Sequence, residues 1–129
     1  MASEFEVVDV WIGTFPSKGR YEAFFSESYT SDDDNAPISE FATALDVSFY
    51  DHDFIEHSFD DFPADVSNLL KAHSFSERYL SLATKAAKEA GITSGNVAVL
   101  AWGLQFAAPR SIDIGEIKLT YLGRFESEG

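Results

Sequence analysis

Cysteine is absent from the 129-residue chain, which excludes disulfide bonds, thiolate nucleophiles and metal sites built on cysteine ligands. Long apolar runs are absent as well. The longest, residues 97–104, is much too short to cross a bilayer as a helix. The first six residues, MASEFE, are acidic and lack the basic and apolar regions of a signal peptide. These absences predict a soluble cytoplasmic protein with no membrane partner.

Lysine and arginine are absent from residues 21–70, although this stretch holds thirteen Asp and Glu residues. The other nine acidic residues are matched by the nine Lys and Arg of the chain, so the formal charge of −13 resides in this one stretch. Such a charge repels nucleic acid and attracts basic partners. Improved solubility is the simpler explanation of an acidic chain, but it does not account for the segregation. We therefore expect a basic protein partner and no nucleic acid.

The composition is that of a folded protein. The apolar fraction of 45% and the 12 Phe, 5 Tyr and 2 Trp residues are too high for a disordered acidic chain. A chain of this length can bury a core without cross-links. With no linker or internal repeat in the sequence, we expect a single domain over residues 1–129.

Hydrophobic periodicity predicts strands and helices in a mixed order. Residues rich in β-branched and aromatic side chains predict strands at 5–15, 47–54, 96–104 and 117–125. Helical spacing predicts a helix over 18–28 and others that begin at Pro37, Asp61 and Ser74. The order β-α-α-β-α-α-β-β indicates an α+β fold. We expect a mixed or largely antiparallel sheet of about four strands with helices packed on one face.

Two of these helices carry further signals. After Pro37, the residues Ile38, Phe41, Ala42 and Leu45 share one helical face and should be buried. Farther on, Ser74 and Glu77 form a capping-box pair, in which each side chain satisfies a free backbone N–H of the other.

The densest polar chemistry is the block YDHDFIE at residues 50–56. In a regular strand, Asp51, Asp53 and His57 would share one face. They could then contribute to a metal site if other elements supplied the remaining ligands. Surface carboxylates without a metal are the commoner case, so we expect no metal and no cofactor.

Other signals of catalysis are weak. The carboxylates are too numerous to single out an acid/base pair. The segment GITSG at residues 91–95 has the wrong spacing for a nucleophile elbow, and there is no glycine-rich phosphate loop. The aromatic residues Tyr50, Phe54 and Phe59 alternate with acids, and are either exposed anchors for a partner or part of the core.

Three segments resemble a known family. They are VWIGTF at residues 10–15, SEF at 39–41 and YDHDFIE at 50–56. This combination resembles the Immunity protein 22 family of bacterial polymorphic toxin systems. The resemblance implies a small α+β protein, made beside a toxin, that binds and silences this toxin. It implies no catalytic residue, and only the acidic block around Asp51, Asp53 and Glu56 is carried over as a contact surface.

Charge and resemblance together favour a non-enzymatic inhibitor that binds a basic toxin domain, for example a nuclease, through an acidic surface. The alternatives are a metal-assisted small hydrolase that uses Asp51, Asp53 and His57, and an acidic interaction module unrelated to toxins. The sequence does not define an oligomeric state. The residues that we expect to contact the partner are Asp32, Asp33, Asp34, Asp51, Asp53, Glu56, Asp60 and Asp61.

Overall fold

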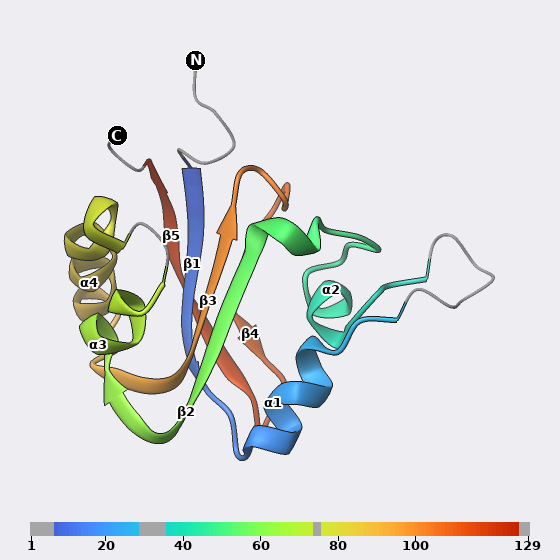
Figure 1. Cartoon of the computed structure of the whole chain (residues 1–129), viewed down its shortest axis with the longest axis horizontal. Helices are drawn as coiled ribbons and strands as arrows, with labels where there is room; N and C mark the ends of the chain where they lie inside the picture. Colours follow the sequence, from blue (N-terminus) through green and yellow to red (C-terminus); the bar gives the residue numbers. More distant parts are fainter. Residues whose placement is uncertain (1–6, 29–35, 74–75, 127–129) are drawn as a thin grey trace.

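A computed structural model of the chain, which describes residues 7–28, 36–73 and 76–126, contains one antiparallel sheet. The strand order is β2-β3-β1-β5-β4, so β1 is central and β2 forms one edge (Figure 1). The strands are β1 (Val7–Thr14), β2 (Ile55–Asp65), β3 (Ser94–Trp102), β4 (Ile112–Asp113) and β5 (Lys118–Glu126). The predicted α+β class and antiparallel sheet are confirmed, with five strands in place of about four.

Helices cover both faces of the sheet. The described residues form α1 (Lys18–Phe25), α2 (Glu40–Ala44), α3 (Val66–Lys71) and α4 (Leu80–Glu89). Helices α1 and α2 pack on one face, and α3 and α4 on the other (Figure 1). The expectation of one covered face was therefore wrong, because β1 and β3 are apolar and buried on both sides and need cover on each. None of the described helices is long and apolar enough to span a membrane.

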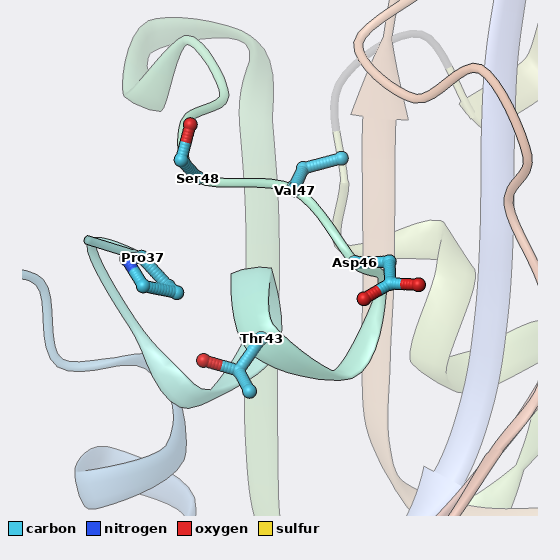
Figure 2. A pocket seen from close by; sticks show the side chains of 5 residues that line it. All are labelled: Pro37, Thr43, Asp46, Val47 and Ser48. Carbon is cyan, nitrogen blue, oxygen red and sulfur yellow. The ribbon is translucent and has the colours of Figure 1, made fainter. Parts of the chain in front are cut away.

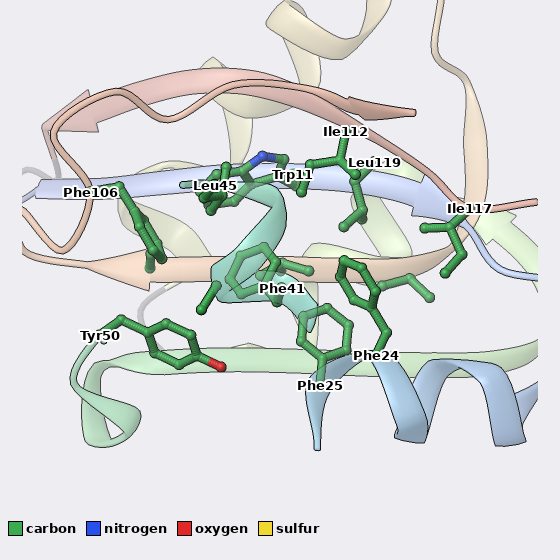
Figure 3. Packing of buried hydrophobic residues seen from close by; sticks show 14 of the residues in the cluster. Trp11, Phe24, Phe25, Phe41, Leu45, Tyr50, Phe106, Ile112, Ile117 and Leu119 are labelled. Carbon is green, nitrogen blue, oxygen red and sulfur yellow. The ribbon is translucent and has the colours of Figure 1, made fainter. Parts of the chain in front are cut away.

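The face covered by α1 and α2 has an aromatic core (Figure 3). Trp11 of β1 lies at its centre, with its ring edge-on to Phe41 at 5.7 Å and to Phe106 at 5.9 Å between centroids. Its indole N–H donates to the backbone carbonyl of Arg110. Edge-to-face packing of this kind adds about 0.5–1.5 kcal/mol per pair beyond the area that it buries.

The face covered by α3 and α4 has a mostly aliphatic core. Val10 and Ile12 alternate with Trp11 along β1 and point to this side, where they join Leu70, Tyr79 and Ala83. Leu82 of α4 is exposed and does not contribute to this core. The buried side chains of α4 are Ala83 and Ala87, whose small size lets the helix lie close to the sheet.

Serine side chains begin the first two helices. Ser17 accepts a hydrogen bond from the N–H of Arg20, and Ser39 accepts one from the N–H of Ala42. Because Ser39 is the cap, α2 begins three residues after Pro37, where the sequence placed its start. The four residues predicted to form its buried stripe are all buried, which confirms that part of the prediction. The pair formed by Ser74 and Glu77 lies partly outside the described residues.

The second strand is displaced along the chain from its predicted place at 47–54. Residues His52–Phe54 form a 3₁₀ turn, because the Asp51 carboxylate accepts a hydrogen bond from the N–H of Asp53. The strand β2 follows this turn and extends through Asp61 and Pro63, where the sequence predicted a helix start. Helix α3 therefore begins only at Val66. The short strand β4 falls in the predicted loop before the last strand.

Candidate functional site

Four of the predicted contact residues lie along the exposed edge of the sheet. Asp51 and Asp53 lie in the turn just before β2, and Asp60 and Asp61 lie at the middle of the strand. Ile55 and Asp60 are five positions apart in β2, or roughly 17 Å at about 3.3 Å per residue, and Asp53 lies two positions before Ile55, in the 3₁₀ turn. We call these four residues the acidic edge. Asp32, Asp33 and Asp34 lie outside the described residues.

The acidic edge is not neutralised within the described part of the chain. There, the ion pairs of arginine join Arg20 to Glu40 and Glu116, Arg110 to Asp46, and Arg124 to Asp9. None of these pairs includes a residue of the acidic edge. Asp53, Asp60 and Asp61 are exposed, so their charges face solvent.

The start of the acidic edge is held by local hydrogen bonds. Besides capping the 3₁₀ turn, Asp51 donates its backbone N–H to Oε1 of Gln105 at 2.9 Å. Gln105 in turn donates to the carbonyl of Trp102. This contact brings together the loops before β2 and after β3, which carry the exposed side chains Phe49 and Leu104. Asp51 therefore has a structural role, and Asp53 is the freer charge at this end.

Beyond the middle of β2 the strand bulges away from β3. Phe59 pairs with Val97 and Ala64 pairs with Gly95, so four residues of β2 lie opposite the single residue Asn96. Asp60 and Asp61 belong to these four residues, together with Phe62 and Pro63. A bulge of this size directs side chains away from the regular sheet.

Glu56 does not share this exposure. Its carboxylate accepts hydrogen bonds from the indole N–H of Trp102 at 3.0 Å and lies 3.1 Å from Nδ1 of His73. The side chain is only 29% exposed. Glu56 therefore joins β2 to β3 and to the segment after α3, and it is not part of the acidic edge.

Ser58, His73 and Glu56 have the connectivity of a serine–histidine–carboxylate triad. Ser58 Oγ lies 2.8 Å from Nε2 of His73, whose Nδ1 faces Glu56. A substrate would have to reach both Ser58 and His73, yet the His73 side chain is only 7% exposed. Ser58 also lies within a regular strand, paired with Ala98. The arrangement favours a structural link between α3 and the sheet over catalysis.

His57 is enclosed by aromatic rings rather than directed at a metal. Its ring stacks on Phe25 at 4.3 Å, and the hydroxyl of Tyr21 hydrogen-bonds to Nδ1. Burial lowers the pKa of His57 below its ordinary value of 6.5, because the charged form is poorly solvated there. The predicted shared face of Asp51, Asp53 and His57 does not form, because the 3₁₀ turn interrupts the strand. No group of three His, Asp or Glu residues in the described ranges could hold a metal ion.

His52 has the opposite environment. It is exposed, and its Nδ1 lies 3.0 Å from Oε2 of Glu27, which also accepts a hydrogen bond from the hydroxyl of Tyr50. The hydrogen bond with Glu27 is the main reason why the pKa of His52 is raised. This pair connects the segment after α1 to the turn before β2.

The three aromatic residues that alternate with acids in the sequence belong to the cores of the protein. Tyr50 is buried, and Phe54 and Phe59 pack at the rim of the two cores. The most exposed aromatic side chain of this region is instead Phe62, with 81% of its surface accessible, ahead of Phe49. The sequence placed Phe62 on a helix. Its position between two acids and a proline was the signal for an exposed turn.

Two of the shallow hollows in the described part of the chain contain no residue of the acidic edge. One, of about 340 Å³, is lined by Pro37, Thr43, Asp46, Val47 and Ser48 (Figure 2). The other, of about 250 Å³, is lined by Asp65, Val66, Ser67, Thr84, Lys88, Ile92 and Thr93. Neither contains Ser58, His73 or a cluster of acid/base groups, so neither supports a reaction.

These features define an α+β protein on a five-stranded antiparallel sheet, with exposed carboxylates along one edge strand. The chain belongs to the family described as Immunity protein 22, whose sequence model matches residues 8–128. The resemblance found in the three sequence segments is thus confirmed. Membership supports an immunity function in general and implies a cognate toxin as partner. No curated protein and no solved structure matches the chain.

Proposed function

We propose that the chain is a non-enzymatic inhibitor that acts in the cytoplasm and binds a basic toxin domain through the acidic edge. The observation that carries the proposal is the exposure of Asp60 and Asp61 on an edge strand and of Asp53 in the turn before it, without an ion pair in the described part of the chain. A nuclease is a fitting target, because its substrate cleft must present cations to phosphates.

The spacing along β2 determines how these charges act. At physiological salt the Debye length is about 8 Å, which is about half the roughly 17 Å that β2 spans from Ile55 to Asp60. The two ends of the acidic edge therefore act as separate local charges on a bound partner. At low salt their fields add and accelerate the first encounter.

The positions of Asp60 and Asp61 allow their charge to be changed without a change in the fold. Asp60 and Asp61 are on the bulge and make no hydrogen bond that the strand pairing requires. Replacing them should not disturb the fold, since exposed side chains outside such contacts change stability by less than about 0.5 kcal/mol. Charge and folding can therefore be tested independently.

The test is a charge reversal with a matched control. The variant D60K/D61K is compared with E89K/E126K, which changes the net charge equally at exposed positions in α4 and at the end of β5. Association with the toxin domain encoded by the neighbouring gene is measured by stopped flow at several salt concentrations. We expect D60K/D61K to slow association about tenfold at low salt and to flatten its salt dependence.

The control variant separates position from net charge. It should slow association by less than about twofold at the same ionic strength, because its charges lie on α4 and β5 and not on β2. Equal slowing by both variants would show that only the overall charge matters. Unchanged association of D60K/D61K would contradict the proposed surface.

A further inference from the structure

Phe62 is the most exposed large apolar side chain in the described part of the chain. It lies in the four-residue bulge of β2, between Asp61 and Pro63. The aromatic residues close to it in the sequence, Phe54 and Phe59, pack against the two cores. Its exposure is thus a property of the bulge and not of the strand as a whole.

The bulge is held in place at both ends. Phe59 pairs with Val97 on one side and Ala64 with Gly95 on the other. A Cβ atom at Gly95 would lie 2.6 Å from the carbonyl oxygen of Gly13, so only glycine fits at this point. In Pro63 the ring fixes the backbone φ angle next to Phe62. Because the two ends of the bulge are constrained, the bulge loses little conformational freedom when a partner binds Phe62.

Opposite the bulge, the side chain of Asn96 makes two hydrogen bonds with the backbone of Phe15. Its Oδ1 accepts from the N–H of Phe15 at 2.9 Å, and its Nδ2 donates to the carbonyl of Phe15 at 2.8 Å. These buried bonds join β3 to the segment after β1. The part of the sheet that supports the bulge is therefore fixed independently of the four bulged residues.

Protection of the sheet edge explains only part of this arrangement. Acidic residues, proline and a bulge on an edge strand all hinder pairing with another strand, and natural proteins use them against aggregation. Asp60, Asp61 and Pro63 fit that role. Phe62 does not, because an exposed aromatic ring beside an open edge favours association.

We propose that Phe62 is the aromatic anchor of the toxin interface and enters an apolar pocket that basic side chains surround. This inference rests on the proposed function. The chemistry of the pocket follows from complementarity: the ring requires an apolar floor, and Asp60 and Asp61 beside it require cations at the rim. Aromatic anchors at the centre of an interface contribute most to slow dissociation.

The experiment separates the anchor from the charges. Dissociation and association with the toxin domain encoded by the neighbouring gene are measured for F62A, F62W and the control L82A. Leu82 is a suitable control because it is also an exposed apolar residue, and it lies on α4 and not on β2. We expect F62A to dissociate about 30-fold faster, with association and its salt dependence within twofold of the original chain.

The two controls test specificity. F62W should retain most of the slow dissociation, because it also offers a large ring, and L82A should behave as the original chain. All three variants should keep the original melting temperature within about 2 °C, since exposed side chains contribute little to stability. Equal dissociation of F62A and the original chain, with D60K/D61K still slow to associate, would overturn the anchor and leave the proposed function intact. A toxin domain that does not bind the original chain would overturn both.

Discussion

The central strand β1 and the edge strand β2 use the same side chain in opposite ways. Asp9 of β1 is fully buried, and its carboxylate accepts hydrogen bonds from Arg124 at 3.0 Å and from the hydroxyl of Tyr121 at 2.6 Å. Asp60 and Asp61 of β2 are exposed and take part in none of the ion pairs of the described residues. A carboxylate in β1 therefore joins strands, whereas one on the bulge leaves its charge available to a partner.

Position in the sheet accounts for this difference. A strand with neighbours on both sides places its polar side chains against other elements, and a buried charge is tolerated only when it is paired. An edge strand has one open side, where a charge keeps its hydration and opposes strand pairing. Residue type alone does not distinguish the two cases.

The strongest test of the comparison is the removal of Asp9. Asp9→Ala should lower the free energy of unfolding by about 3 kcal/mol, because it leaves Arg124 and Tyr121 without their shared acceptor. Urea denaturation measures the change. We expect the matched substitution Asp61→Ala to change the same quantity by less than about 0.5 kcal/mol.

A double substitution identifies the cause of that loss. Arg124→Met should also destabilise the chain, because it leaves Asp9 buried beside Tyr121 alone. If the three groups act as a unit, Asp9→Ala combined with Arg124→Met should cost clearly less than the sum of the single changes. Additive losses would show that the ion pair is not the source of the effect.

Glu56 sharpens the comparison, because it lies on the edge strand and yet makes inward hydrogen bonds. Glu56→Ala should destabilise the chain by about 2 kcal/mol, since Trp102 and His73 each lose a partner. Glu56→Gln keeps an acceptor for Trp102 and should recover part of the loss. Neither change should alter the rate of toxin association by more than about twofold, as stopped flow can establish.

Slow association of Glu56→Gln with unchanged stability would reverse this assignment. Glu56 would then belong with the charges of the acidic edge, as the sequence suggested. The availability of a carboxylate to a partner thus depends on its hydrogen bonds as well as on the position of its strand in the sheet.

Much of the fold follows from periodicity. The apolar strand around Trp11 and the buried stripe that includes Phe41 stand out in the sequence, and both are in the core. The placement of helices on both faces could have been inferred, because a strand that is apolar on both sides requires two covers. Long-range pairing decides the rest, such as the bonds between Asn96 and Phe15, 81 positions apart in the chain.

The candidate site was predictable in composition but not in geometry. The sequence identified Asp53, Asp60 and Asp61 by their segregated charge, and all three are exposed. It assigned Glu56 to the same surface, because a pattern of acids does not show which of them finds a buried donor. It missed the exposure of Phe62, because the bulge depends on where Gly95 and Val97 pair with β2.

Replacement of His57 should give the smallest of the expected effects, a change in how stability depends on pH. It compares the side of β2 that α1 covers with the exposed bulge of the same strand. Its ring lies on the side covered by α1, against Phe25, and its pKa is lowered mainly by burial. The folded chain therefore binds a proton to His57 less readily than the unfolded chain does. As the pH falls from about 7 through the ordinary value of 6.5, the unfolded state takes up this proton first and stability decreases. The decrease ends once the pH is below the lowered pKa of the folded state.

The measurement compares the free energy of unfolding of the original chain and of His57→Gln between pH 4.5 and 8. The difference between the two should grow in favour of the variant as the pH falls through that window, whatever the absolute stability of each. His52 is present in both chains, and its raised pKa acts in the opposite direction, so most of its contribution cancels in the comparison. A difference that does not vary with pH would show that His57 is solvated like the acids of the bulge. The covered side of the edge strand would then not behave as part of the core.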